Sequence, residues 1–322
     1  MRTPVFALAA LATVVLASPA ALAQSYPSKP IRWVVPYPAG GGSDFMARTL
    51  GAQMSTELGQ AITVDNKPGG NGAIAAQDIL RIGPDGYAVM NADNGHMVYN
   101  PALYKSLTYK VSELAPVTLV GKVSMLLVAP PSSEFKDGRD FLAKAKAAPG
   151  KYSIASAGSG SPHHLAIEML KHQAGLFMVH IPYRGAAPAL ADVAGGQVPL
   201  AMSDYAAAAG FVKGGKVKVL AVANATRLPQ LPEVPTLAEL GVNGAEAAAL
   251  VGLVTVAGTP PDVIAKLQQA AAKSFQNPAV RQKFIDAGVE PGGLPTAEYA
   301  ALLQSETGRW HKLIRDLKIS LD

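Results

Sequence analysis

The 322-residue sequence contains no cysteine, which excludes a disulfide framework, a thiolate metal site and a catalytic thiol. Charged residues make up only 16%, against about 25% in typical globular domains. Hydrophobic residues reach 49%, so the chain does not have the composition of a disordered protein. Because Lys and Arg exceed Asp and Glu only by 28 to 23, we expect no nucleic-acid partner. Aromatic residues, at 6%, are too few to favour a pocket of stacked rings.

The first 23 residues have the pattern of an export signal. Arg2 precedes an apolar stretch over residues 5–17, and the small residues around Leu22 form a cleavage site. No later stretch reaches the roughly 18 uninterrupted apolar residues of a membrane span. We therefore expect a signal peptide over residues 1–23, cleavage after Ala23 and a periplasmic mature protein. An uncleaved membrane anchor is the alternative.

The remaining sequence alternates short apolar runs with helical patterns, and its length predicts roughly two domains at about 150 residues each. Such alternation is typical of an α/β fold with mainly parallel sheets flanked by helices. Two long apolar segments, 114–128 and 248–257, are predicted to cross between the two halves. The other predicted strands are 31–36, 61–65, 87–91, 151–156, 178–182, 198–203 and 216–222. The predicted helices are 44–58, 73–81, 141–148, 162–174, 187–194, 260–276, 278–287 and 296–317.

A glycine-rich loop follows the first predicted strand and leads directly into a helix. Its glycines allow a sharp turn and close approach of the backbone to a ligand. The helix that follows offers free N–H groups and the positive end of its dipole, which together suit a carboxylate or phosphate. The alternative is a tight turn with a helix cap at Ser43 or Asp44. The candidate binding residues are Gly40, Gly41, Gly42, Ser43 and Asp44.

A second loop in the other half repeats this design, and a third polar loop is predicted over residues 91–96. Pro162 suits the first turn of the helix that begins after the second loop. Ligands of open α/β sheets bind at the carboxyl ends of the strands, where all three loops are expected. The candidate binding residues are Ser156, Gly158, Ser159, Gly160, Ser161 and His164 in the second loop, and Ala92 and Asn94 in the third.

Single polar residues at two further strand ends could also contact a ligand. Tyr183 could stack on a ligand or hydrogen-bond to it, and Arg184 could pair with a carboxylate; the alternative is a buried Tyr and a solvated Arg. Asp204 could hold an amino or hydroxyl group, or simply cap a helix. His163 and His164 point about 100° apart on a helix, so they cannot chelate one metal together, although one of them could donate to a ligand.

Enzyme motifs are missing or incomplete. The sequence contains no G-x-S-x-G elbow and no H-E-x-x-H pair. The segment GFVKGGKV over residues 210–217 lacks the hydroxyl that a phosphate-binding loop places on Mg²⁺. A hydrolase using Ser159 or Ser161 with His163 or His164 has no evident orienting carboxylate. We therefore expect a binding protein that is not an enzyme and that needs no cofactor or metal.

Six segments, taken in order, resemble the substrate-binding proteins of tripartite tricarboxylate transporters, also called the Bug receptors. Each motif alone is moderately specific, but the ordered set is very specific and spans essentially all of the mature chain. The segments are YPSKPI (26–31), PYPAGGGSDFMAR (36–48), DNKPGGNG (65–72), PDGYAVM (84–90), HIPYRGAAPALADVAGGQV (180–198) and LPEVPTLAELG (231–241).

The resemblance implies a Venus-flytrap fold of two lobes joined by two crossover strands. It places lobe 1 at residues 24–123 and 251–322, and lobe 2 at 124–250. The loops at 40–44 and 156–164 would form opposite walls of a cleft that holds a small carboxylate, with Asp204 reading its distal end. The implied partners are the ligand and membrane permease subunits, and the protein would act as a monomer. A sensor that presents the bound solute to a kinase is an alternative.

Three segments depart from the family pattern. Leu250 stands where the family commonly has Trp, and Thr255-Val256 replaces Ala-Pro, which changes the packing expected near the hinge. Ser203 replaces a common Phe, a change that could widen or repolarise the pocket. Ligand identity therefore stays open among dicarboxylates, tricarboxylates, acidic amino acids and aromatic acids.

Overall fold

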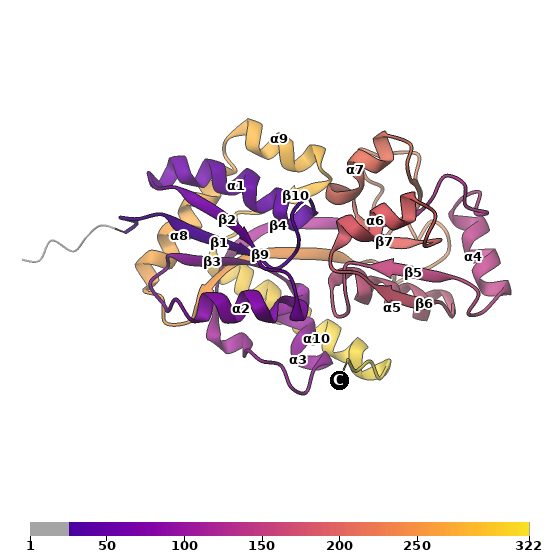
Figure 1. Cartoon of the computed structure of the whole chain (residues 1–322), viewed down its shortest axis with the longest axis horizontal. Coiled ribbons are helices and arrows are strands. Elements are labelled where there is room, and N and C mark those ends of the chain that lie inside the picture. Colours follow the sequence, from indigo (N-terminus) through magenta and orange to yellow (C-terminus); the bar gives the residue numbers. More distant parts are fainter. Residues whose placement is uncertain (1–25, 322) are drawn as a thin grey trace, which may run out of the picture.

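The computed structural model describes residues 26–321, and the predicted signal peptide lies outside this part of the chain. No helix within residues 26–321 is long and apolar enough to cross a membrane. The described chain forms two α/β lobes connected by two long strands, as Figure 1 shows. The predicted two-lobed α/β fold is confirmed.

Lobe 1 is built from both ends of the chain. Strand β1 runs parallel to β2 and β3. Helix α1 packs against α8 and α9, whereas α2, α3 and α10 lie along the other side of the lobe in Figure 1. The elements are β1 (Ile31–Val35), α1 (Gly42–Leu58), β2 (Ile62–Asn66), η1 (Gly70–Gly72), α2 (Ala73–Leu80), β3 (Ala88–Asp93), the π-helix η2 (Gly95–Tyr99), α3 (Asn100–Leu103), η3 (Val111–Glu113), α8 (Pro261–Ser274), α9 (Pro278–Asp286), β10 (Val289–Pro291) and α10 (Thr296–Asp316).

Lobe 2 repeats the strand–helix pattern with shorter strands. Strand β5 runs parallel to β6 and pairs in the same direction with β7. The strands β5, β6 and β7 each lead into a helix at their carboxyl end, so these three junctions share one edge of the sheet. The elements are α4 (Gly138–Ala147), β5 (Ser153–Ser156), α5 (Pro162–Ala174), β6 (Val179–Pro182), α6 (Ala186–Ala194), β7 (Ala201–Asp204), α7 (Tyr205–Lys213) and β8 (Lys218–Val222).

The two lobes share the antiparallel strands β4 (Leu114–Ala129) and β9 (Ala248–Val256). Strand β4 pairs with β9 as far as Ser124, and from Met125 onward it pairs with β7 and β8. The resulting strand order is β2-β1-β3-β9-β4-β7-β5-β6. The antiparallel pairs all involve these two crossing strands, while β1–β3 in lobe 1 and β5–β7 in lobe 2 are parallel as predicted. The residue limits of the lobes given above stay a prediction.

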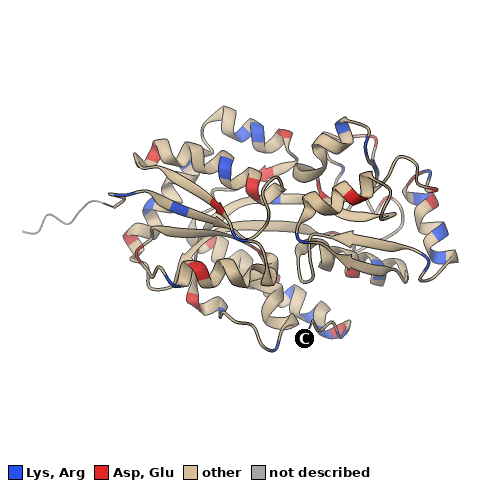
Figure 2. Cartoon of the chain, viewed as in Figure 1, with Lys and Arg blue, Asp and Glu red and all other residues tan. Residues whose placement is uncertain are grey.

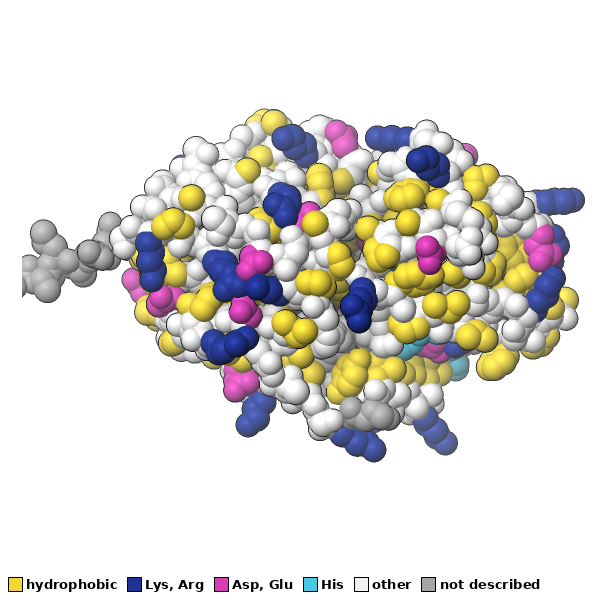
Figure 3. All heavy atoms as spheres, in the orientation of Figure 1, with side chains coloured by type: hydrophobic (Ala, Val, Ile, Leu, Met, Phe, Trp, Pro, Cys, Tyr) yellow, Lys and Arg dark blue, Asp and Glu magenta, His cyan; other side chains and the backbone are white. Residues whose placement is uncertain are grey.

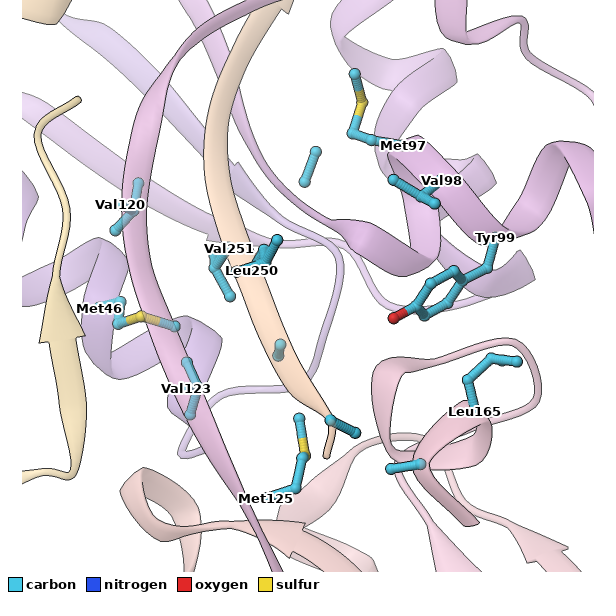
Figure 4. Close-up of a cluster of buried hydrophobic side chains, with 14 of the residues drawn as sticks. Met46, Met97, Val98, Tyr99, Val120, Val123, Met125, Leu165, Leu250 and Val251 are labelled. Atoms are coloured by element: carbon cyan, nitrogen blue, oxygen red, sulfur yellow. The ribbon is translucent and has the colours of Figure 1, made fainter. Parts of the chain in front are cut away.

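A buried hydrophobic cluster surrounds the crossing strands. Figure 4 shows Met46 of α1, Met125 of β4, Val251 of β9 and Tyr99 of η2 in this cluster, with Leu165 of α5 from lobe 2. All of these side chains are buried. Helices of both lobes therefore pack on the connection between them, which positions the two lobes relative to each other.

Charged residues are few and lie mostly on outer helices and loops, as the coloured ribbon of Figure 2 shows. On the face drawn in Figure 3, Lys and Arg stand singly or in small groups among uncharged and hydrophobic side chains. The low charge content of the sequence thus leaves this face without a broad basic patch.

One predicted loop is wrong. Residues 91–96 do not form a loop, because β3 continues to Asp93 and the chain then turns directly into the π-helix η2. Asn91 is buried within the strand and accepts a hydrogen bond from the Trp33 indole N–H at 2.9 Å. Asn91, a polar residue that the sequence pattern assigned to a loop, is therefore part of the buried core. Strand β10 and helix α3 were not expected either.

Candidate functional site

A small cavity lies between the lobes, and we call it the inner cavity. Its volume is about 40 Å³, which at roughly 10–15 Å³ per molecule holds about three waters. Lobe 1 contributes the start of α1 and the end of β3, lobe 2 contributes the starts of α5, α6 and α7, and both crossing strands form its floor. The lining residues are Tyr37, Pro38, Gly41, Gly42, Ser43, Met46, Asp93, Val123, Ala157, His163, Gly185, Ala186, Ala187, Pro188, Asp204, Ala249 and Val251.

The start of α1 faces this cavity without a side-chain cap. Gly41 is the N-cap residue, and it offers no side chain to cap the helix. The first N–H groups of a helix have no partner within the helix, and the helix dipole places positive potential there. The hydroxyl of Ser43 lies in the same turn and accepts a hydrogen bond from the Asn91 amide at 3.0 Å. This turn is suited to holding a carboxylate by backbone donors.

Asp44 and Gly40, two predicted site residues, do not line the inner cavity. The Asp44 carboxylate accepts hydrogen bonds from Arg48 Nε at 3.0 Å, Gly40 N at 3.1 Å and Asn66 Nδ2 at 3.0 Å. Burial opposes ionisation of Asp44, but these donors outweigh it, so the pKa of Asp44 lies below its usual value. Asp44 therefore holds the loop in shape and keeps its charge away from the cavity.

The start of α5 is capped by its own side chains. Ser161 is the N-cap residue, and its hydroxyl accepts from His164 N at 3.3 Å and donates to Gly158 O at 2.6 Å. The Gly160 N–H donates to the ring Nδ1 of His164 at 3.1 Å. Gly160, Ser161 and His164 line neither cavity described here. The second loop is thus not a copy of the first, although their sequences suggest the same design.

A Ser–His contact does occur behind this loop. The Ser156 hydroxyl lies 2.7 Å from Nε2 of His180, and the His180 ring stacks on His164 with centroids 4.0 Å apart. Burial lowers the pKa of His164 to about 4, with a further contribution from Lys171. Burial and the charge of His164 lower the pKa of His180 to about 3. Because Ser156 is fully buried, this pair belongs to the interior of lobe 2.

His163, and not the predicted His164, faces the inner cavity together with Asp204. Its Nε2 lies 3.2 Å from Oδ2 of Asp204, and both residues are buried. Asp204 also caps α7, because Oδ1 accepts from Ala207 N at 2.8 Å. Cap and cavity wall are therefore compatible roles for Asp204. Which of the two adjacent histidines reaches the cavity follows from the rotation of α5 and is not visible in the sequence.

The sequence analysis missed Asp93 and Tyr37, both of which line the inner cavity. The Tyr37 hydroxyl donates to Oδ2 of Asp93 at 2.7 Å, and His96 Nδ1 lies 2.7 Å from Oδ1. Burial raises the pKa of Tyr37 well above its usual value, and the Asp93 charge raises it further. Polar residues do mark the end of the third strand in the sequence, but the residues predicted to bind there were the neighbours Ala92 and Asn94.

Ala92 and Asn94, the two candidates from that region, line neither cavity. Ala92 is fully buried in β3. The Asn94 amide donates to the Tyr99 hydroxyl at 2.5 Å and to Ala248 O at 3.1 Å, and its oxygen accepts from Leu250 N at 3.3 Å. Asn94 therefore connects the crossing strand β9 to lobe 1 through hydrogen bonds.

A larger hollow of about 830 Å³ adjoins the inner cavity, and we call it the outer chamber. Tyr37, Pro38 and Ala157 line both spaces. The predicted site residues Gly158, Ser159 and Tyr183 line only the outer chamber, where the Tyr183 hydroxyl donates to Asp192 at 2.6 Å. Arg184 is the one charged side chain among the described residues that line this chamber.

The lobes are in close contact around the inner cavity. A Cβ atom on Gly42 would lie 2.5 Å from Oδ1 of Asp204, so only glycine permits this approach. A Cβ on Gly160, where φ is +74°, would lie 2.5 Å from the Asn71 amide of lobe 1. The structure therefore represents an arrangement with the lobes together. Over residues 26–321, no group of three or more His, Asp or Glu side chains is placed to hold a metal ion.

The family model of the tripartite tricarboxylate transporter family receptor matches residues 46–319. The chain belongs to this receptor family. The predicted resemblance is therefore confirmed. The chain is 34% identical over 321 residues to the UPF0065 protein in the tcbD-tcbE intergenic region of Pseudomonas sp. (strain P51), covering 99% of this chain and 95% of that protein.

Two solved structures extend the comparison to three dimensions. The periplasmic binding protein BugD is 30% identical, with a TM-score of 0.87 over 92% of this chain and 100% of BugD. The structure of R. palustris Rpa4515 with adipate is also 30% identical, with a TM-score of 0.88 over 92% of this chain and 100% of that chain. The receptor family is thus one of solute-binding proteins, and one similar structure holds a dicarboxylate.

Proposed function

We propose that this protein captures a small carboxylate in the inner cavity between its lobes and delivers it to a membrane transporter. The observation that carries the proposal is the start of α1, where Gly41, Gly42 and Ser43 face the cavity without a side-chain cap. Among the described residues, no Lys or Arg lines this cavity. Backbone N–H groups and the helix dipole are then the groups that hold the anion. The adipate bound by Rpa4515 supports this ligand class.

Capture proceeds by closure of the lobes. The open lobes admit the ligand, and its carboxylate binds at the start of α1. Lobe 2 then closes over it with His163 and Asp204, while β4 and β9 act as the hinge. The ligand favours the closed arrangement because it contacts both lobes there, and an equilibrium shifts only by such differential affinity. The predicted lobe limits, 24–123 with 251–322 and 124–250, describe the two bodies that move.

The proposal places the mature protein in the periplasm after removal of residues 1–23. The loaded form is recognised by the permease subunits of a tripartite tricarboxylate-type transporter, in keeping with the family to which the chain belongs. One chain binds one ligand and acts as a monomer, without cofactor or metal. Catalysis has no part in this function: the Ser161 hydroxyl, one of the two that a hydrolase would use, is engaged as a helix cap.

A thermal-shift screen of carboxylates against the mature protein tests this function. A ligand that binds only the folded state raises the melting temperature. Gly41→Asp should abolish that shift, because it places a negative charge beside the bound anion. The position accepts a side chain: φ is −87°, and the atom nearest to an added Cβ is Pro38 O at 4.0 Å.

Gly41→Ala is the control, since its side chain carries no charge and cannot cap the helix. No atom lies closer than 4.0 Å to an added Cβ, so neither variant should unfold the protein. Loss of the ligand shift in Gly41→Asp, with much of it retained in Gly41→Ala, supports the anion site. An unchanged shift in Gly41→Asp would show that the carboxylate binds elsewhere.

A further inference from the structure

The outer chamber is much larger than the inner cavity. Its volume is about 830 Å³ against about 40 Å³, which lies within the roughly 300–1,000 Å³ of ordinary small-molecule sites. We propose that the outer chamber is a second binding site, separate from the α1 anion site, for a monocarboxylate with a bulky apolar body such as an aryl acid. The chemistry of the chamber walls leads to this ligand class.

A wall formed by both lobes divides the outer chamber from the inner cavity. Tyr37, Pro38 and Ala157 line both spaces. The lobes are close at this wall, because a Cβ on Gly185 would lie 2.9 Å from Cδ of Pro38. The α1 residues Gly41–Ser43 line the inner cavity and not the outer chamber. An acid with a phenyl ring is larger than the roughly three waters that fit the inner cavity, so the two spaces take ligands of different size.

The walls of the outer chamber are mostly apolar. The Tyr37 hydroxyl donates to Asp93 at 2.7 Å, and the Tyr183 hydroxyl donates to Asp192 at 2.6 Å. Both tyrosines therefore offer their rings to the chamber while their hydroxyls are engaged with the protein. The side chain of Ile74, at the start of α2, is 47% exposed, and an apolar ligand body would remove it from water. Other apolar residues of the wall are Pro36, Pro68, Leu107 and Pro182.

Arg184 supplies the charge of the outer chamber. It is exposed, and within residues 26–321 its guanidinium takes part in no hydrogen bond or ion pair. The planar guanidinium binds a carboxylate through two parallel hydrogen bonds and also stacks on aromatic faces. No Asp or Glu of the described residues lines the chamber, so a bound anion meets no acidic neighbour there. One cation beside an apolar wall matches one carboxylate on an apolar body.

The outer chamber exists only when the lobes are together. Lobe 1 contributes residues 68–74 and 106–108, and lobe 2 contributes residues 157–159 and 182–184. An acid bound there contacts both lobes and favours their closed arrangement. The proposed function gives the inner carboxylate the same preference, so each ligand should raise the affinity of the other by an equal factor. This coupling rests on the proposed function, whereas the second site itself does not.

Isothermal titration calorimetry of the mature protein with 3-phenylpropanoate tests the second site. We expect a dissociation constant below about 1 mM, and at least about fivefold weaker binding of 3-phenylpropanamide, which has the same body but no charge to pair with Arg184. Gly41→Asp should leave the affinity for 3-phenylpropanoate unchanged, because Gly41 does not line the outer chamber. The carboxylate with the largest shift in the thermal screen, added at saturation, should tighten 3-phenylpropanoate binding at least about fivefold.

Two pairs of variants assign the binding to the chamber walls. Arg184→Gln should weaken 3-phenylpropanoate binding about five- to tenfold. Arg281→Gln removes a charge that is also exposed but lies outside the chamber, and should have no effect. Ile74→Ser should weaken binding about threefold, whereas Ile82→Ser replaces an isoleucine of similar exposure, 41%, outside the chamber. All four positions are exposed, and thermal unfolding without ligand verifies that each variant is folded.

The outcomes separate this inference from the proposed function. If 3-phenylpropanoate does not bind the wild-type protein, or binds Arg184→Gln and Arg281→Gln equally well, the second site is overturned. Loss of its binding in Gly41→Asp, or competition with the small carboxylate, also overturns the second site, because either result places it in the inner cavity. A screen in which no small carboxylate binds overturns the proposed function and the coupling, while 3-phenylpropanoate still tests the second site.

Discussion

Two strand-to-helix junctions with similar sequences, at the starts of α1 and α5, differ in how the helix N-terminus is capped. At the start of α1, Gly41 leaves the helix without a side-chain cap, and the turn faces the inner cavity. At the start of α5, Ser161 caps the helix and the Gly160 N–H is bonded to His164. The first junction keeps its donors available to a ligand, while the second uses its own side chains.

The difference shows that a glycine- and serine-rich junction does not by itself leave the start of a helix uncapped. An N-terminal hydroxyl that accepts from the helix competes with any anion for the same N–H groups. Lobe 2 instead lines the cavity with His163 and Asp204. His163 lies in the first turn of α5, after the capping residue Ser161, and Asp204 ends strand β7. We propose that ligand binding and stability are divided between the two junctions, and the following variants test that division.

The largest effect is expected where the α1 junction meets lobe 2. Gly42→Ala would place a Cβ 2.5 Å from Oδ1 of Asp204, an atom that the Ala207 N–H holds in place. Overpacking of this kind costs on the order of 1–3 kcal/mol, which weakens ligand binding by about 5- to 150-fold if closure carries the whole cost. Calorimetry with the acid that binds best measures this loss.

Gly210→Ala is the control for that variant. It is also a helical glycine, on α7, and an added Cβ has no neighbour within 4 Å. Its dissociation constant should equal that of the wild-type protein. If Gly42→Ala binds as tightly as Gly210→Ala, the close approach of the lobes at Gly42 is not part of the bound state.

The next effect comes from the histidines behind the α5 junction. The pKa of His164 is lowered to about 4 and that of His180 to about 3, against about 6.5 in an unfolded chain. Below pH 6.5 the unfolded state therefore binds more protons, and stability falls as the pH drops towards 4. Between pH 7.5 and 5 each ring should cost about 2 kcal/mol at most.

Denaturant unfolding at the two pH values measures this loss. His180→Asn removes one of the two stacked rings and should reduce the pH dependence, whereas His172→Asn, at an exposed position, should leave it unchanged. The α1 junction titrates in a different range: Asp44, with its lowered pKa, loses its contribution only below about pH 3.8. If stability depends on pH equally in the wild-type protein and both variants, the pair of His164 and His180 is not the source of that dependence.

The smallest effect is the helix cap itself. Ser161→Ala removes the hydroxyl that accepts from His164 N, and loss of such a cap costs about 1 kcal/mol of stability. Ligand affinity should change little, because Ser161 does not line the inner cavity. Ser159→Ala, in the same loop and without a helix-capping role, should change stability by less than about 0.5 kcal/mol. A strong loss of ligand affinity in Ser161→Ala would show that the α5 junction contributes to ligand binding.

The order of strands and helices could be predicted because it depends on local patterns. The apolar run of β1 and the Ser161-Pro162 start of α5 are visible in the sequence, and α5 begins and ends where expected. The end of β3 could not be placed, since Asn91 and Asp93 read as loop residues. They lie in a buried strand because partners far along the chain, Trp33 and Tyr37, satisfy their polar atoms.

The sequence by itself determined the receptor family, the two-lobed α/β fold and the loop for which we propose an anion site. The tertiary structure decided which side chains reach the cavity. The Asp44 carboxylate is hydrogen-bonded by Arg48 and Asn66. Of the two adjacent histidines, only His163 contacts Asp204, which lies 41 residues further along the chain. The reason is physical: a strand–helix pattern follows from neighbouring residues, whereas the partner of a polar side chain depends on packing between distant segments.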